Sequence, residues 1–425
     1  MDMRRREFLV VSGQSTLLAL TACATKTSPL PASDGQAESS LERRVAAVVQ
    51  AYDSQGNHRT ATDGDMASAN WLADETRKAG AEALLEPFDL SRVDPGACYV
   101  STASRRIDGV PLFDANFTDD AGVSGRLGSL GSDSEIGLTE SEPSRLTDPG
   151  SESRRAVLTE VRQSRHKAVV LITRGARPGL FLLNAPAFTK PFGPSTLQVS
   201  SAEAAWLNDQ ARARAEVTLI AKVERRPAKA ANVTARIAGT DASLPPIVIS
   251  TPRSGWWQCA SERGGGLACW LEVLRTLVVL KPRRDCLFAA FSGHEIGWLG
   301  IQDYLKRRPD LVKRAHAWLH FGANVGALQQ PNMINASDDT LERWAVAAME
   351  KEGLQVNRKA KRGSTPFGEA AIVHRGGGRY VALVCDSDVF HNVADRWPEA
   401  VDVATLARYA RAFAASVAQI APTTA

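Results

Sequence analysis

The sequence predicts an α/β fold, in which a mostly parallel or mixed sheet is covered by helices on both faces and carries an inserted β-rich domain. From residue 228 onward, short apolar runs typical of buried strands alternate with segments of helical periodicity. Between residues 95 and 227 the sequence changes to short β-rich runs separated by Gly, Ser, Asp and Pro. We therefore expect functional side chains at the carboxyl ends of the strands of the main sheet.

The elements follow in a regular order. Two helices are expected at residues 40–50 and 66–78, before the insertion, and strands at 168–173 and 217–221 within it. An alternating, exposed strand is expected at 232–240. Buried strands follow at 246–250, 286–291, 317–321 and 380–384, and helices at 267–280, 301–307 and 401–420. The main domain thus comprises residues 39–94 and 228–425, and the inserted domain comprises residues 95–227.

Composition limits the possible partners. The 425-residue chain is 44% hydrophobic and has a formal net charge of +4, without a basic run interleaved with aromatics, so nucleic acid is not an expected partner. No apolar stretch of about 20 residues follows the N-terminal segment, so no membrane-spanning helix is expected. The five cysteines after Cys23 have irregular spacing and form no paired metal motif, so most are expected to be buried small hydrophobes.

The N-terminal residues 1–23 have the pattern of a signal peptide. A twin-arginine-like segment, R-R-R-E-F-L at 4–9, precedes a weakly apolar stretch, and L-T-A-C at 20–23 resembles a lipobox. Lipidation is expected at Cys23, followed by a tether rich in Ser, Pro, Thr and Ala over residues 24–38. The protein is therefore expected to be lipid-anchored on the periplasmic side of a bacterial membrane, with the outer membrane favoured because residue 24 is Ala. A plain N-terminal helix is the alternative.

The most specific motif is S-G-H-E-I-G-W-L-G at residues 292–300, directly after the expected strand 286–291. It resembles the S-G-x-E-x-G-x-L-G motif of the zinc aminopeptidases (peptidase M28 type), a superfamily that includes the glutaminyl cyclases. F-H-N-V-A-D at 390–395 resembles that family's Y-H-T-x-x-D motif. The segment 56–73 resembles its N-terminal region, and the insertion resembles a protease-associated domain in position and texture. The resemblance implies a zinc-exopeptidase-like fold.

In that family five ligands hold two metals. The resemblance places the first ligand, a His, at Pro252 and a later Asp at Gly322 or Ala323, so both are lost. It keeps counterparts of the bridging Asp, the ligand Glu and the final His, which are Glu262, Glu295 and His391. These three residues imply a single zinc site with an open fourth position, as catalytic zinc requires.

The family's catalytic Glu is replaced by His294. We expect this imidazole to accept a proton from zinc-bound water in place of the family's carboxylate, since imidazole groups ordinarily titrate near neutral pH. Alternatively, His294 is a fourth ligand that closes the site. Side chains expected to contact the substrate are Trp256, Trp257, Arg253, Arg263 and His320.

Other interpretations remain open at this stage. Arg253 or Arg263 can pair with Glu262 and fill the vacated site with positive charge, which would leave it free of metal. His391 can be an ordinary loop histidine, and the tryptophans can serve in packing. The leading functional hypothesis is a single-metal hydrolase that acts on an amide or peptide-like bond of a peptide or small molecule. The alternatives are a catalytically inactive aminopeptidase-like binding protein and a glutaminyl-cyclase-like acyl transferase. The sequence predicts no oligomeric state.

Overall fold

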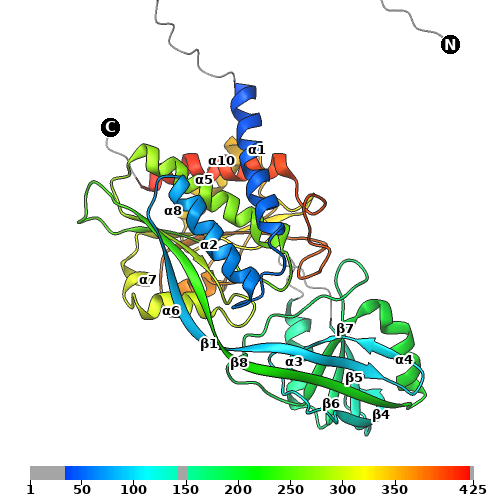
Figure 1. Cartoon of the computed structure of the whole chain (residues 1–425). Helices are drawn as coiled ribbons and strands as arrows, with labels where there is room; N and C mark the ends of the chain where they lie inside the picture. Colours follow the sequence, from blue (N-terminus) through cyan, green and yellow to red (C-terminus); the bar gives the residue numbers. More distant parts are fainter. Residues whose placement is uncertain (1–33, 142–150, 422–425) are drawn as a thin grey trace, which may run out of the picture.

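The computed structural model describes residues 34–141 and 151–421, and it confirms the predicted α/β class. Hydrogen-bonded strands form one sheet that continues from the main body into the β-rich part (Figure 1). The predicted signal peptide with Cys23, and the tether up to residue 33, lie outside the described residues. Residues 34–38, which were expected to belong to the tether, instead begin the helix α1 (Asp34–Asp53).

The centre of the main sheet is parallel. β9 (Ile247–Pro252) pairs with β10 (Cys286–Phe291) and β11 (Ala317–Phe321), and β11 also pairs with β14 (Tyr380–Cys385). These strands are nearly continuous apolar runs because helices cover both faces of the sheet. β8 (Glu216–Ile237) and β12 (Asn332–Ala336) flank them in antiparallel pairing, and β13 (Arg358–Lys359) pairs with β12.

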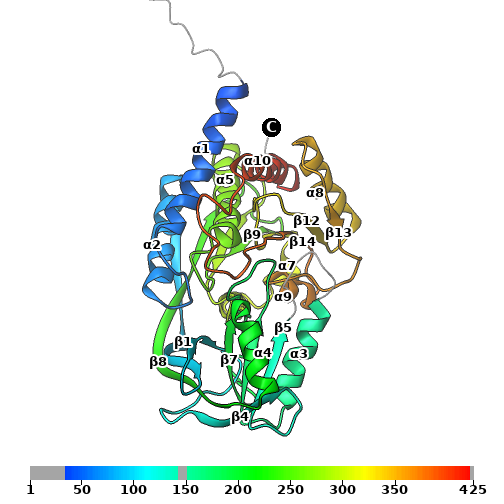
Figure 2. The same cartoon turned by 90° about the vertical axis from the view of Figure 1, so that its right-hand side faces the viewer.

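Two layers of helices enclose this sheet (Figures 1 and 2). One layer contains α1 (Asp34–Asp53), α2 (Asp63–Lys78), α5 (Gly265–Leu280), α8 (Asp339–Lys351) and α10 (Val403–Ile420). The other contains α6 (Leu299–Lys306), α7 (Leu311–Arg314) and α9 (Ala370–Arg375). Successive strand side chains alternate between the layers: Ile247 and Ile249 pack in the first core and Val248 in the second.

The β-rich part is joined to the main body by two long strands. β1 (Ala83–Ser101) and β8 are paired antiparallel along this connection, and the register shifts between Pro95 and Cys98. The predicted insertion boundaries, at residues 95 and 227, therefore fall within strands. Beyond them, β4 (Val123–Ser129), β5 (Ile136–Ser141), β6 (Ala168–Thr173) and β7 (Ser195–Ser200) are parallel. Smaller elements complete this part: β2 (Arg106–Asp108), β3 (Val110–Pro111), α3 (Ser151–Gln163), η1 (Ser201–Glu203) and α4 (Ala204–Arg212).

One expected strand is present but was wrong in its exposure and its end. The segment 232–240 was expected to be an exposed strand, but β8 ends at Ile237 and pairs with β1 on one side and β10 on the other. Residues 232–235 are buried. The alternating pattern was misleading because both faces of this interior strand are covered.

The described cysteines are all buried free thiols, as expected: Cys98, Cys259, Cys269, Cys286 and Cys385. Within residues 34–141 and 151–421, no helix is both long and apolar enough to cross a membrane.

Candidate functional site

The candidate site is a cavity of about 430 Å³ at the carboxyl ends of the parallel strands. His294 follows β10, His320 belongs to β11, and His391 lies beyond β14. Glu369 precedes α9, and a loop of the β-rich part contributes Leu183, Asn184 and Pro186 to the wall. The fold therefore places the polar groups where the parallel-sheet topology predicts a site.

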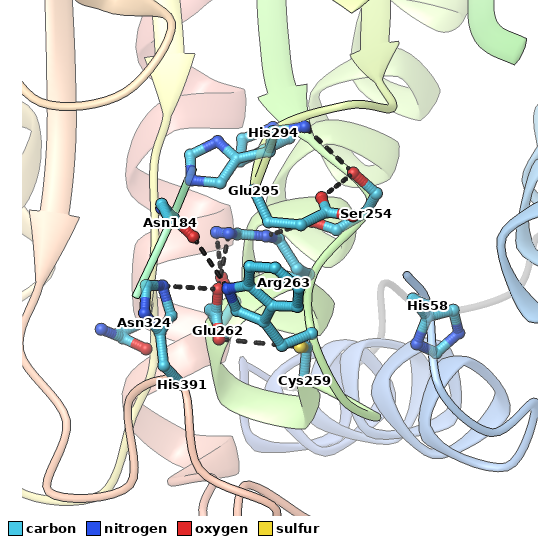
Figure 3. Close-up of polar contacts among 12 residues, drawn as sticks. His58, Asn184, Ser254, Cys259, Glu262, Arg263, His294, Glu295, Asn324 and His391 are labelled. Carbon is cyan, nitrogen blue, oxygen red and sulfur yellow. Dashed lines mark hydrogen bonds and ion pairs between the residues drawn. The ribbon is translucent and has the colours of Figure 1, made fainter. Parts of the chain in front are cut away.

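Glu262 lies in a short π-helical turn, η2 (Ala260–Gly264), that leads into α5. Asp395 holds this turn by accepting the backbone N–H groups of Ser261 at 2.8 Å and Glu262 at 2.9 Å. The Glu262 carboxylate is buried, and its Oε1 lies 2.5 Å from the Arg263 guanidinium and 3.5 Å from His391 Nε2 (Figure 3). The sequence thus brings Glu262 and His391 together as predicted, but with a guanidinium beside them.

Glu295 is engaged elsewhere. Its Oε1 accepts the Thr60 backbone N–H at 2.6 Å. Its Oε2 accepts the Ser254 hydroxyl at 2.7 Å (Figure 3). The Arg263 Nε donates to the Ser254 carbonyl at 2.7 Å, so Arg263 connects the Ser254 loop to the turn that carries Glu262. Both oxygens of Glu295 therefore serve to hold the loops around it.

These donors do not fit a zinc ion. Glu262 faces a guanidinium, which is a fixed positive charge, and the two oxygens of Glu295 already accept hydrogen bonds. Within the part of the chain that the structure describes, no three His, Cys, Asp or Glu side chains come together as metal ligands. The predicted set of Glu262, Glu295 and His391 is not assembled, because Arg263 takes the place of a cation beside Glu262.

Glu262 and Arg263 each stabilise the charged form of the other. Burial alone would raise the pKa of Glu262, but the charges of Arg263, His391 and His294 lower it below its usual value. Burial alone would lower the pKa of Arg263, but the charge of Glu262 raises it overall. Both side chains are therefore charged in the folded protein, and neither is exposed to solvent.

Glu369 forms a second polar cluster, which lines the cavity directly. Its Oε1 accepts the His294 Nδ1–H at 2.8 Å, and its Oε2 lies 3.7 Å from His320 Nε2. Burial would raise the pKa of Glu369, but His294, His320 and Arg263 lower it to about 2. Burial lowers the pKa of His320 to about 4, so this imidazole is neutral near pH 7. The cavity therefore contains an ionised carboxylate between two imidazoles.

The other residues expected at the substrate have different positions. Arg253 is fully buried and pairs with Asp65 at 2.9 Å, away from the cavity wall. Trp256 and Trp257 line a second hollow of about 400 Å³. Their indole N–H groups donate to Asn184 at 3.1 Å and to the His391 carbonyl at 3.0 Å. His320 is the member of the expected set that lines the main cavity, whereas Arg263 is bound to Glu262.

Glu369 is the main residue of the site that the sequence did not point to. Its partners His294 and His320 are distant in the sequence, so only the fold brings the three together. Similarly, His58 was noted only as part of a resembling segment. It stacks on Tyr52 with ring centroids 3.7 Å apart and donates from Nδ1 to the Gln258 carbonyl at 3.0 Å, so it anchors the loop that carries Ser254.

Solved structures of zinc aminopeptidases share this fold. A zinc aminopeptidase from Bacillus subtilis matches with a TM-score of 0.70 and 16% identity, covering 90% of this chain and 95% of its own. A Peptidase M28 precursor from Shewanella amazonensis SB2B matches with a TM-score of 0.71 and 16% identity, covering 92% and 96%. An aminopeptidase from Aneurinibacillus sp. strain AM-1 matches with a TM-score of 0.66 and 14% identity, covering 91% and 94%.

The predicted resemblance is therefore confirmed at the level of the fold: this chain has the M28-like zinc aminopeptidase fold. No family model matches the sequence, and no curated protein is similar to it in sequence. Sequence identities as low as these establish a shared fold and not a shared activity. The chemistry of this protein therefore follows from its own side chains.

The loop that closes the cavity from the β-rich part gives a testable pH dependence. Asp114 accepts the Ala187 backbone N–H at 2.7 Å, next to Pro186 in the wall. Burial raises the pKa of Asp114 from 3.8 to about 7, although the Ala187 N–H and the charge of Arg162 oppose the shift. The folded state therefore favours the protonated carboxyl. The stability from this group is complete below pH 3.8 and is lost as pH rises to about 7.

We expect Asp114→Asn to remove this dependence. Urea unfolding at pH 5 and pH 8 should show wild type losing more stability than the variant over this interval, by at most about 3 kcal/mol. Asp108→Asn, at an exposed position, is the control and should shift stability by under about 0.5 kcal/mol at both pH values. Equal pH slopes for wild type and Asp114→Asn would contradict the assignment.

Proposed function

We propose that this protein is a metal-independent binding protein built on the zinc aminopeptidase fold. The observation that carries this proposal is the ion pair between Glu262 and Arg263, 2.5 Å apart and buried from solvent. A guanidinium at this position neutralises the charge of the carboxylate and opposes a divalent cation by direct repulsion. The proposal corresponds to the alternative in which an arginine fills the vacated metal site.

The proposal is supported by the other ligand positions. Pro252 stands where the first ligand is expected, and Gly322 or Ala323 where the later Asp is expected. Neither proline nor these small residues carries a side-chain donor for a metal. Glu295 keeps its carboxylate, and its hydrogen bonds to Thr60 and Ser254 explain its presence as a structural anchor.

A binding role is supported by the cavity itself. Its wall combines apolar side chains with a few converging polar groups, which is the usual composition of a small-molecule or peptide site. The apolar members include Leu183, Phe367, Val384 and Phe390. We propose a peptide or small molecule as the ligand.

A second candidate, a metal-independent hydrolase, is favoured by one contact. The carboxylate of Glu369 accepts the Nδ1–H of His294, so Nε2 is the ring nitrogen that can accept a proton. An imidazole oriented in this way by a carboxylate can take a proton from an attacking water. In the sequence, His294 stands where the resembling family has its catalytic carboxylate.

Turnover assays separate these functions. With aminoacyl and dipeptidyl p-nitroanilides, the binding-protein proposal expects no hydrolysis, either with added zinc or after treatment with a chelator. Hydrolysis that needs zinc would refute metal independence. Hydrolysis that survives the chelator and is lost in His294→Gln would favour the second candidate. The solved zinc aminopeptidase from Bacillus subtilis is a suitable positive control for the assay.

We also propose that the protein is exported and held at the periplasmic side of a bacterial membrane by lipid on Cys23. The support is the order of the twin-arginine-like segment, the apolar stretch and the lipobox-like residues. Membrane fractionation tests this: Cys23→Ala should move the protein to the soluble periplasmic fraction, and an unchanged distribution would contradict lipidation.

A further inference from the structure

One oxygen of a buried carboxylate in the cavity receives no hydrogen bond from the part of the chain that the structure describes. Glu369 is 1% exposed, and its Oε1 is bound by His294. Its Oε2 has no hydrogen-bond partner among the described residues, and the same is true of His320 Nε2, 3.7 Å away. Leaving such a group unsatisfied in a buried site is costly, so a ligand that supplies donors here gains affinity.

The second acceptor is the neutral imidazole of His320. Its Nδ1 lies 3.0 Å from the Ser250 hydroxyl. When Nδ1 carries the proton and donates it to Ser250, Nε2 presents a lone pair toward Glu369 Oε2. The low pKa values of both groups are consistent with an ionised carboxylate beside a neutral ring. Two acceptors, one of them negatively charged, therefore face the same small space.

The surroundings favour a cation with an apolar body. Phe367 and Phe390 line the cavity, and aromatic faces attract cations. An ammonium group has three N–H donors and a positive charge, so it can donate to both Glu369 Oε2 and His320 Nε2 at once. A hydroxyl has one donor and no charge. The remaining cation of the wall, Arg375, is exposed, so solvent screens its charge.

We propose that Glu369 and His320 bind the ammonium group of a primary amine whose apolar part fills the cavity. This inference rests on the proposed binding function. Two kinds of ligand have an ammonium group next to an apolar group. One is a simple arylalkyl amine, and the other is a peptide whose amino-terminal residue is apolar. The volume of about 430 Å³ accommodates either.

Calorimetric titration with a matched pair of probes tests this inference. 2-Phenylethylamine and 2-phenylethanol have similar shape, and only the amine carries charge near pH 7. Wild type should bind the amine about 10-fold or more tightly than the alcohol, since a charge-assisted hydrogen bond exceeds a neutral one by about that ratio. Glu369→Gln should lose this preference and keep the affinity for the alcohol. Glu224→Gln, at a position 59% exposed, is the control and should match wild type.

Equal affinities of wild type for the two probes, or no binding of the amine, would overturn the inference. This comparison does not depend on the folding of the variant. A preference that persists in folded Glu369→Gln would also overturn it. Phenylalanyl-glycine and its N-acetyl form then separate the two kinds of ligand: tighter binding of the free peptide than of the simple amine assigns the peptide terminus.

The two proposals fail in different ways. Equal binding of amine and alcohol would leave a ligand-binding cavity in place and refute only the ammonium site. Zinc-dependent turnover would refute the binding-protein proposal, and the probe preference could still be measured.

Discussion

Replacing Arg263 with Met is expected to lower the free energy of unfolding by about 3–5 kcal/mol. The substitution keeps an apolar stem of similar length and removes the guanidinium, which leaves Glu262 buried without its cation. It also removes the Nε donor of the Ser254 carbonyl. Urea unfolding followed by circular dichroism measures the loss, provided that the transition is two-state.

A paired variant separates the charge from the packing. Glu262→Gln combined with Arg263→Met removes both charges, so it should recover a substantial part of the loss. Arg226→Met is a control of matched geometry: Arg226 pairs with Glu224 at the same 2.5 Å, but both are more than half exposed. Its effect should stay below about 1 kcal/mol. A loss of under about 1 kcal/mol in Arg263→Met would contradict the role of the buried pair.

Gly265→Ala is expected to destabilise the protein by about 3 kcal/mol or more, through a steric clash. Gly265 begins α5, and a Cβ there would lie 1.7 Å from the backbone carbonyl oxygen of Val325. That oxygen belongs to the main chain, so it can move away only if the loop after β11 shifts. The gain in helix propensity from Ala is about 1 kcal/mol and does not offset the clash.

A second glycine gives the control. At Gly96 a Cβ would meet only the Lys222 carbonyl oxygen, at an ordinary 3.5 Å. Gly96→Ala should therefore change stability by less than about 1 kcal/mol. A similarly small effect for Gly265→Ala would show that α5 does not approach the loop after β11 as closely as described.

Most of the fold could be predicted from periodicity and apolar runs. The expected strands 286–291 and 317–321 coincide with β10 and β11, and the helix expected at 267–280 is α5 with two more residues at its start. Local patterns suffice here because both faces of a parallel sheet are buried. For 232–240 the pattern predicted the wrong exposure, since alternation in the sequence does not reveal that partner strands lie on both sides.

Less of the site than of the fold could be predicted from the sequence. Motif spacing correctly brought Glu262 near His391, and the alternative pairing of Glu262 with Arg263 is confirmed. The motif could not show that the oxygens of Glu295 are bound by Thr60 and Ser254, because Thr60 is far away in the sequence. Glu369 likewise meets its imidazole partners only through the fold.

The central claim is that Arg263 has replaced the metal beside Glu262. The most direct test is the zinc content of the intact protein folded with excess zinc and then dialysed, measured by elemental analysis for wild type and Glu295→Ala. The account predicts well below one zinc per chain in wild type, and no change in Glu295→Ala. One zinc per chain in wild type that is lost in Glu295→Ala would contradict it and restore the single-metal site of Glu262, Glu295 and His391.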